Sequence, residues 1–375
     1  MGAHQSVYAG KAKLDVGVNL IQKLYSSSNV LSPLSLCLKL PTLFGNGDLL
    51  DVSWHKGLHD SNLLINYRTP RPPCLGQRSL NIVHSLKPEI GIHGIPVNNF
   101  CHSASGDVKI SKLSIGLDMN EPSSYNWKTT TSVHFKAVRE CGSDGGGLEG
   151  GYAAASFSSS NQHIHFINDC GRSVSRDLDG FPLTLSGNSY DNMVVISQES
   201  RFEEVNDHKF SHYSFRVEQG IPIHPNLAIF NRFKFSASKG VKIGSAFFST
   251  LFNGGSLVGA TAPYEAFAIG GPNSVRGYGE GAVGSGYSSV VSKNEFSFPL
   301  DKQLTGVVFL DFGSDLRSSN RVLGNPGLRK GKPGSGIGIG YGIRFKTELV
   351  QITADCAINA FKQRTLYFGI NNLVL

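Results

Sequence analysis

Two charged residues, one arginine and one aspartate, stand among neighbours that are mostly small or apolar. Arg276 lies in the glycine-dense stretch 270–281, which reads GGPNSVRGYGEG, and Asp311 lies in the stretch 309–313, which reads FLDFG. A guanidinium and a carboxylate can form a bidentate ion pair. These residue types therefore support the attachment of a loop to a strand rather than catalysis, and we expect Arg276 to pair with Asp311.

The glycine-dense stretch must lie against another part of the molecule. Glycines let a backbone bend sharply and approach other groups closely, whereas Val275, Arg276 and Tyr278 have side chains that need partners. We predict that the residues 275–278, Val275, Arg276, Gly277 and Tyr278, dock on the strand that contains Asp311 and Gly313. Exchanging the two charges is expected to restore part of the interaction. The simpler alternative is an ordinary glycine-rich hairpin turn.

The same stretch matches the dinucleotide fingerprint at Gly279, Gly281 and Gly284. That fingerprint binds a pyrophosphate only when a helix leaves the glycines. Here residues 287–300 are rich in serine and β-branched residues, so a strand is expected and no cofactor is predicted. The chain contains no H-E-x-x-H, G-x-S-x-G or Walker motif, and we expect no enzyme activity. His163 and His165 could share one face of a strand, but without a third ligand no metal site is predicted.

Composition excludes a helical membrane protein. In the 375 residues, 40% of them apolar, no run approaches the ~18 apolar residues of a membrane helix. A transmembrane strand needs only about 9–11 residues, and the chain length allows about 16 such strands with their connections. The net charge of +7 comes from scattered residues. This favours a basic lumen or anionic lipid headgroups over a nucleic-acid partner.

Alternation of apolar and small or polar residues recurs along the chain. Its strongest instance is 336–346, where Gly336, Gly338, Gly340 and Gly342 alternate with isoleucine and tyrosine. Further stretches that fit strands are 12–20, 34–40, 82–86, 113–119, 133–138, 193–202, 213–220, 227–237, 350–359 and 365–370. A soluble sandwich gives the same period. Four glycines on one face favour a membrane barrel instead, because they open space inside it for the loop.

The expected fold is therefore all-β: one transmembrane antiparallel β-barrel of about 16 strands over residues 1–375. Residues 254–286 are expected to form a loop inside the lumen. Residues 140–168, rich in glycine and serine, are expected to form a flexible loop or an insertion.

The V-R-G-Y loop and the F-x-D-x-G strand together resemble a known superfamily, the proteins of outer-membrane assembly and transport. It includes BAM-type insertases, two-partner secretion transporters and the chloroplast Toc-type channel. The resemblance implies a sixteen-stranded barrel in which the loop folds inward and its arginine pairs with the strand aspartate. Members usually carry soluble POTRA repeats. Because the first strand is expected from about Val7, we expect none here, as in the truncated relatives of the chloroplast outer-envelope assembly protein.

This resemblance implies a place and a role. The chain is expected to be a barrel of the chloroplast outer envelope that takes part in inserting or translocating proteins, as an accessory to a full-length relative. The expected partners are membrane lipids, precursor polypeptides and full-length barrel relatives, with no nucleic acid. A solute or ion pore and a soluble all-β binding protein are the alternatives.

Overall fold

The structure, a computed structural model, describes residues 5–9, 12–18, 34–41, 48–56, 61–70, 76–88, 108–121, 126–142, 166–167, 173–174, 185, 190–206, 208–223, 227–279, 281–322, 332–347 and 350–372. Most of these residues form one 17-stranded sheet. No helix among them is long and apolar enough to span a membrane.

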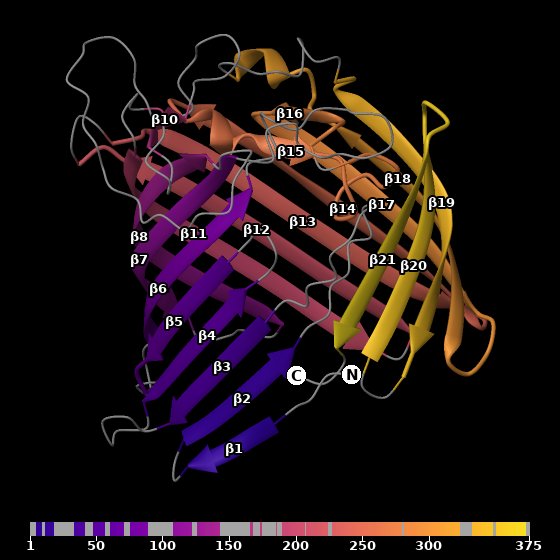
Figure 1. The fold of residues 1–375 in the computed structure, drawn as a ribbon, viewed down its shortest axis with the longest axis horizontal. Helices are drawn as coiled ribbons and strands as arrows, with labels where there is room; N and C mark the ends of the chain where they lie inside the picture. The colour runs from indigo at the N-terminus through magenta and orange to yellow at the C-terminus, as the bar shows by residue number, and fades with distance from the viewer. Residues whose placement is uncertain are drawn as a thin grey trace.

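The sheet is an antiparallel meander in which each strand pairs with the next one along the chain (Figure 1). Its strands are β1 (Gln5–Ala9), β2 (Ala12–Val18), β3 (Leu34–Pro41), β4 (Leu49–Lys56), β5 (Ser61–Arg68), β6 (Gln77–Pro88), β7 (Val108–Asn120), β8 (Trp127–Gly142), β11 (Tyr190–Asn206), β12 (Lys209–Ile221), β13 (Phe230–Ile243), β14 (Ala246–Gly259), β17 (Ser288–Pro299), β18 (Leu304–Ser314), β19 (Ser335–Lys346), β20 (Val350–Asn359) and β21 (Arg364–Asn372). Two short strands, β9 (Phe166–Ile167) and β10 (Ser173–Val174), form a separate pair between β8 and β11.

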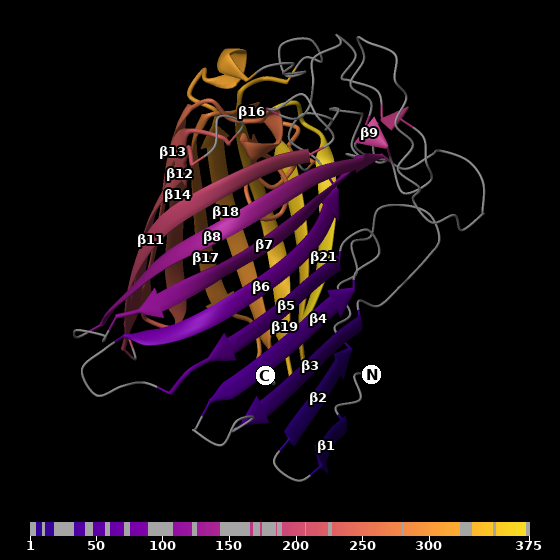
Figure 2. The same cartoon turned by 90° about the vertical axis from the view of Figure 1, so that its left-hand side faces the viewer.

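The sheet curls round into a barrel, as the two views of Figures 1 and 2 show. Strands β1 to β8 form one wall, β11 to β14 the next, and β17 to β21 the wall that turns back toward β1 to β5. Within the described residues, no pairing joins β21 to β1 or β2.

Side chains on each strand alternate between the two faces of this wall. On β19 every glycine from Gly336 to Gly342 is buried, while Ile337 to Ile343 on the other face are exposed. The outward rows of other strands also carry exposed apolar residues, among them Leu117, Val217, Val308 and Leu366. The structure therefore places the apolar row of β19 on the outer face of the barrel and the glycine row on the inner face, as predicted.

The chain between β14 and β17 lies within the curve of the sheet (Figure 1). It contains the 3-10 helix η1 (Pro263–Glu265) and the hairpin of β15 (Phe267–Ile269) with β16 (Gly284–Gly286). A second 3-10 helix, η2 (Ser319–Arg321), follows β18. We call residues 260–287 the central loop.

Several predicted boundaries differ from those in the structure. β14 continues through Gly259, so the central loop begins at residue 260 and not at 254, because Gly255 to Gly259 still pair with β13. The strand predicted from residue 227 begins at Phe230. Of the predicted insertion 140–168, only residues 140–142, at the end of β8, and 166–167 lie within the described part. His163 and His165 lie outside it.

Candidate functional site

Arg276 sits at the centre of the contacts that hold the central loop on the inner wall. Its side chain is 3% exposed and that of Asp311, on β18, is fully buried. Arg276 Nε donates to Asp311 Oδ2 at 2.6 Å, and a terminal nitrogen donates to Oδ1 at 2.9 Å. The backbone N–H of Arg276 also donates to Asp311 Oδ2, at 3.2 Å. The structure thus brings together the two residues that the sequence pairs.

Two more carboxylates, which the sequence analysis missed, complete the surroundings of this guanidinium. Arg276 Nη1 donates to Glu295 on β17 at 2.5 Å and to Asp355 on β20 at 3.3 Å. Arg344 on β19 in turn pairs with Asp355 and lies 3.7 Å from Glu295. All three acids and Arg344 occur at inward positions of the alternation, which is the signal that could have found them. We call Arg276 with Asp311, Glu295 and Asp355 the arginine anchor.

The anchor keeps Arg276 charged. Burial alone would lower the pKa of Arg276, but the hydrogen bonds to Asp311 and the charges of Asp311, Glu295 and Asp355 raise it above its ordinary value. The guanidinium also lies 3.5 Å from the ring centroid of Phe309, close enough for a cation–π contact.

Backbone contacts attach the rest of the V-R-G-Y segment. The N–H of Gly277 donates to the hydroxyl of Tyr367 at 2.9 Å, and this hydroxyl donates to the carbonyl of Tyr278 at 2.9 Å. Asn359 Nδ2 donates to the carbonyl of Gly277 at 3.0 Å. Gly277 has a φ of 93°, in the region that favours glycine. Three strands, β18, β20 and β21, therefore hold consecutive residues of the loop.

Apolar packing supplements these polar contacts. Val275 is fully buried, and Tyr278 packs with it in a cluster. The remaining members of this cluster are Ile269, Ala282, Val283 and Val291. The ring of Tyr278 also meets that of Phe361 edge-on, with centroids 6.4 Å apart.

The glycine row on β19 is only partly a surface for the loop. A Cβ atom at Gly338 would lie 1.8 Å from the carbonyl oxygen of Arg276, and one at Gly336 would meet Val283 and Tyr278. Gly340 and Gly342 instead face strand residues, Phe309 and Asp355 among them. The prediction that all four glycines face the loop is wrong for these two. Gly313 on β18 does lie against the loop, where its Cβ would be 2.6 Å from Val275.

A second anchor holds the start of the central loop with the charges reversed: the loop supplies the carboxylate and the wall supplies the cations. Glu265 in η1 accepts a 2.9 Å hydrogen bond from Lys112 on β7 and pairs with Arg232 on β13. Its neighbour Tyr264 donates to Asp191 on β11 at 2.9 Å. Burial alone would raise the pKa of Glu265, but the charges of Lys112 and Arg232 and their hydrogen bonds hold it below its ordinary value. We call Glu265 with Lys112 and Arg232 the glutamate anchor.

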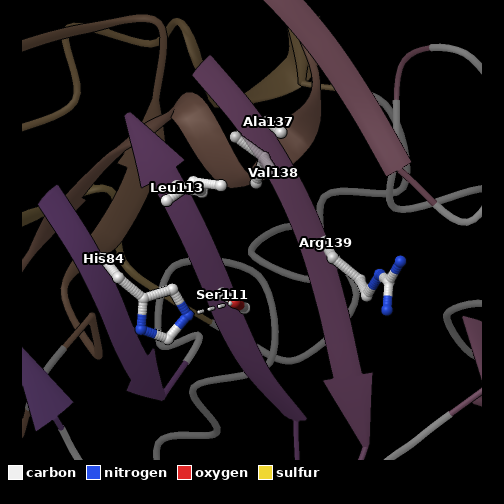
Figure 3. Close-up of a pocket in the computed structure, with 6 residues that line it drawn as sticks. All are labelled: His84, Ser111, Leu113, Ala137, Val138 and Arg139. Atoms are coloured by element: carbon white, nitrogen blue, oxygen red, sulfur yellow. Dashed lines mark hydrogen bonds between the residues drawn. The ribbon is translucent and has the colours of Figure 1, made fainter. Parts of the chain in front are cut away.

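A hollow of about 350 Å³ lies among strands β6, β7 and β8 (Figure 3). A 3.1 Å hydrogen bond joins His84 Nε2 and Ser111 Oγ there. Leu113 in its lining belongs to the outward row of β7 and is exposed. Because no residue of the central loop lines this hollow, it takes no part in holding the loop.

An antiparallel barrel with an inward loop fixed by an arginine is the arrangement that the resemblance to outer-membrane transporters and insertases implies. The chain belongs to the Omp85 superfamily, whose domain model matches residues 43–372. Members of this superfamily are transporters or insertases.

Relatives among the curated proteins include three chloroplast outer envelope proteins of Arabidopsis thaliana. Outer envelope protein 39 is 52% identical over 384 residues, which cover 100% of this chain and 99% of that protein. Outer envelope protein 36 is 43% identical, covering 74% and 91%. Outer envelope protein 80 is 33% identical over 88% of this chain but only 41% of its own length. The predicted family and the predicted place in the chloroplast outer envelope are confirmed.

Solved structures show the same fold. BamA from Haemophilus ducreyi lacking POTRA domains 1–3 superposes with a TM-score of 0.67 at 12% identity, over 99% of this chain and 74% of that one. CdiB from Acinetobacter baumannii gives 0.57 at 14% identity, over 97% and 60%. The barrel fold is thereby confirmed. Because the family and the chloroplast relatives are outer-membrane proteins, the alternative of a soluble all-β protein does not hold.

Proposed function

We propose that this barrel takes part in inserting or translocating proteins at the chloroplast outer envelope, as an accessory to a full-length relative, and that the central loop is its movable part. The observation that carries this proposal is the arginine anchor, which fastens the loop to the inner wall through ion pairs.

A loop whose attachment includes ion pairs and hydrogen bonds, besides a small apolar cluster, can leave and return. Water and a passing polypeptide both offer donors and acceptors that replace such contacts, so the net free energy of each one is modest. The strand pairing of the wall does not pass through the loop. The loop can therefore move while the barrel remains intact.

The proposed partners are precursor polypeptides and a full-length barrel of the same superfamily. Outer envelope protein 80 is an example of such a longer relative, because the match covers only 41% of its length. The exposed apolar rows of the outer wall fit a lipid environment.

The test is insertion of an unfolded outer-envelope barrel protein into liposomes. Vesicles would contain the purified chain, a full-length relative, both, or neither, and folded product would be measured by its heat-dependent gel mobility. We expect the pair to insert substrate faster than the relative alone, and Arg276→Ala to change that rate. Lys239→Ala, at an exposed position of β13, is the matched control. Equal rates with and without the chain would contradict the proposal.

A solute pore is the second candidate, favoured by the basic residues on the inner wall near Glu265. Planar-bilayer conductance separates the two functions. A pore for solutes conducts irrespective of precursor, whereas a precursor polypeptide should block a protein-conducting barrel.

A further inference from the structure

A cavity of about 240 Å³ opens on the inner wall beside the glutamate anchor. Five cationic side chains and two carboxylates line it, which leaves an excess of three positive charges. These residues are Lys112, Lys136, Arg216, Arg232 and Lys234, with Glu218 and Glu265. They come from strands β7, β8, β12 and β13 and from the central loop.

The two carboxylates do not satisfy all five cations. Glu218 pairs with Arg232 at 3.0 Å and with Arg216 at 2.7 Å, and lies 3.9 Å from Lys136. Glu265 pairs with Lys112 and Arg232. Lys234 has no ion-pair partner within the described part of the chain, and its ammonium lies 5.9 Å from the ring centroid of Phe267.

Two of the arginines that line the cavity also carry an unsatisfied hydrogen-bond donor. The Nε atoms of Arg216 and Arg232 are buried and find no acceptor among the described residues. Arg232 as a whole is only 6% exposed. A buried guanidinium donor without an acceptor is unfavourable, and an oxyanion in the cavity would supply one once either side chain turned its Nε toward it.

We propose that this cavity binds a small oxyanion of the phosphate class, either free phosphate or the phosphate group of a small metabolite. A phosphate dianion offers several acceptor oxygens and two charges to a group of guanidinium and ammonium donors. With a water occupying about 30 Å³ of liquid, the volume fits a phosphate with a few attached carbon atoms. A macromolecule is too large, and the cavity faces the lumen rather than the lipid.

Glu265 is the internal competitor of that anion. Its carboxylate comes from the movable loop and already pairs with Lys112 and Arg232 at the edge of the cavity. Removal of its charge should therefore tighten anion binding. If Glu265 served only to hold the structure together, its replacement would weaken binding or leave it unchanged.

The experiment is titration calorimetry of the purified full chain in detergent with inorganic phosphate, at constant ionic strength. We expect saturable binding that is weakened about tenfold or more by Lys234→Met, because a charge-assisted contact is lost. Glu265→Gln should bind phosphate more tightly than the unaltered chain. Lys239→Met, which removes a lysine from the outward row of the same strand, should bind as the unaltered chain does.

Glycerol 3-phosphate provides the second arm. Tighter binding of the ester than of phosphate identifies a metabolite as ligand, and equal or weaker binding identifies free phosphate. Heat-dependent gel mobility checks that each variant is folded, and Lys136→Met replaces Lys234→Met if the latter does not fold. Two results would overturn the proposal: no saturable binding by either the unaltered chain or Glu265→Gln, or equal affinities for Lys234→Met and Lys239→Met.

Discussion

Removing Arg276 should loosen the central loop much more than removing the charge of Asp311. The guanidinium has three acidic partners, so Asp311→Asn leaves it with Glu295 at 2.5 Å and Asp355 at 3.3 Å. Arg276→Met has the opposite effect, because Asp311 remains fully buried without its bidentate partner.

The structure sets the magnitude of this difference. Loss of one partner from a buried ion pair costs about 3–5 kcal/mol, which we expect for Arg276→Met. Asp311→Asn retains an acceptor oxygen and removes charge-assisted hydrogen bonds, for a cost of about 1.5–3 kcal/mol. At 1.4 kcal/mol for each factor of ten, loop opening rises roughly a hundred- to a few-thousand-fold in the first variant and roughly ten- to a hundredfold in the second.

Hydrogen exchange measured by mass spectrometry reports this opening. The informative amides are those of residues 270–279, with those of β19 as an internal reference for the barrel wall. In the double variant the unpaired carboxylate is gone, so exchange should be slower than in Arg276→Met alone. Exchange as fast in Asp311→Asn as in Arg276→Met, or strictly additive effects in the double variant, would refute the reasoning.

Three further results are expected. Gly338→Ala should displace the loop, because the new Cβ would lie 1.8 Å from a loop carbonyl oxygen. Gly369→Ala is the control, because the atom nearest to its new Cβ is a rotatable hydroxyl. Hydrogen exchange of the loop amides should be faster in the first variant than in the second. In a cysteine-free background, cysteine at Ile339, 53% exposed on the outer face, should react with lipid-soluble reagents, and cysteine at the inward Thr353 with water-soluble ones; equal labelling would contradict the membrane barrel. The pKa of Glu265 is lowered, so its stabilisation of the loop is complete above the ordinary value of 4.5 and falls as the pH drops below that value. A spin label beside Glu265 should then become mobile. In a Glu265→Gln chain, which has no carboxylate to protonate at this position, the label should show no such change with pH.

Local pattern was enough to predict most of the strands and the arginine pair, although it missed β14, whose end was expected to belong to the loop. Alternation has a period of two in every strand, so the rows of β19 could be assigned to faces without knowing which strands are neighbours. Arg276 and Asp311 were found because each stands among neighbours that are mostly small or apolar. Both signals lie within a few residues of sequence.

The remaining contacts depend on register and curvature, which local pattern does not contain. Glu295 and Asp355 reach Arg276 only because β17, β18, β19 and β20 pair in one particular alignment. The Lys112–Glu265 contact joins residues 153 positions apart and exists only when the wall has curled round the loop. The additional acids also change one expectation. Exchange of the charges of Arg276 and Asp311 would place an aspartate beside Glu295 and Asp355, so we no longer expect it to restore the interaction.

The two anchors together explain why the loop should return to the wall after it leaves. At the arginine anchor, Arg276, Arg344 and Lys293 balance three carboxylates, with Lys293 directly opposite Asp311 in the strand register. Departure of the loop leaves an excess of one negative charge there.

At the glutamate anchor, departure of Glu265 raises the excess positive charge from three to four. An empty lumen would thus have a negative patch and a positive patch, each matched in sign to one end of the loop. Buried charges are weakly screened by salt. The open state is therefore opposed at both ends, and a substrate that holds it open must supply charges of both signs or make up the difference with other contacts.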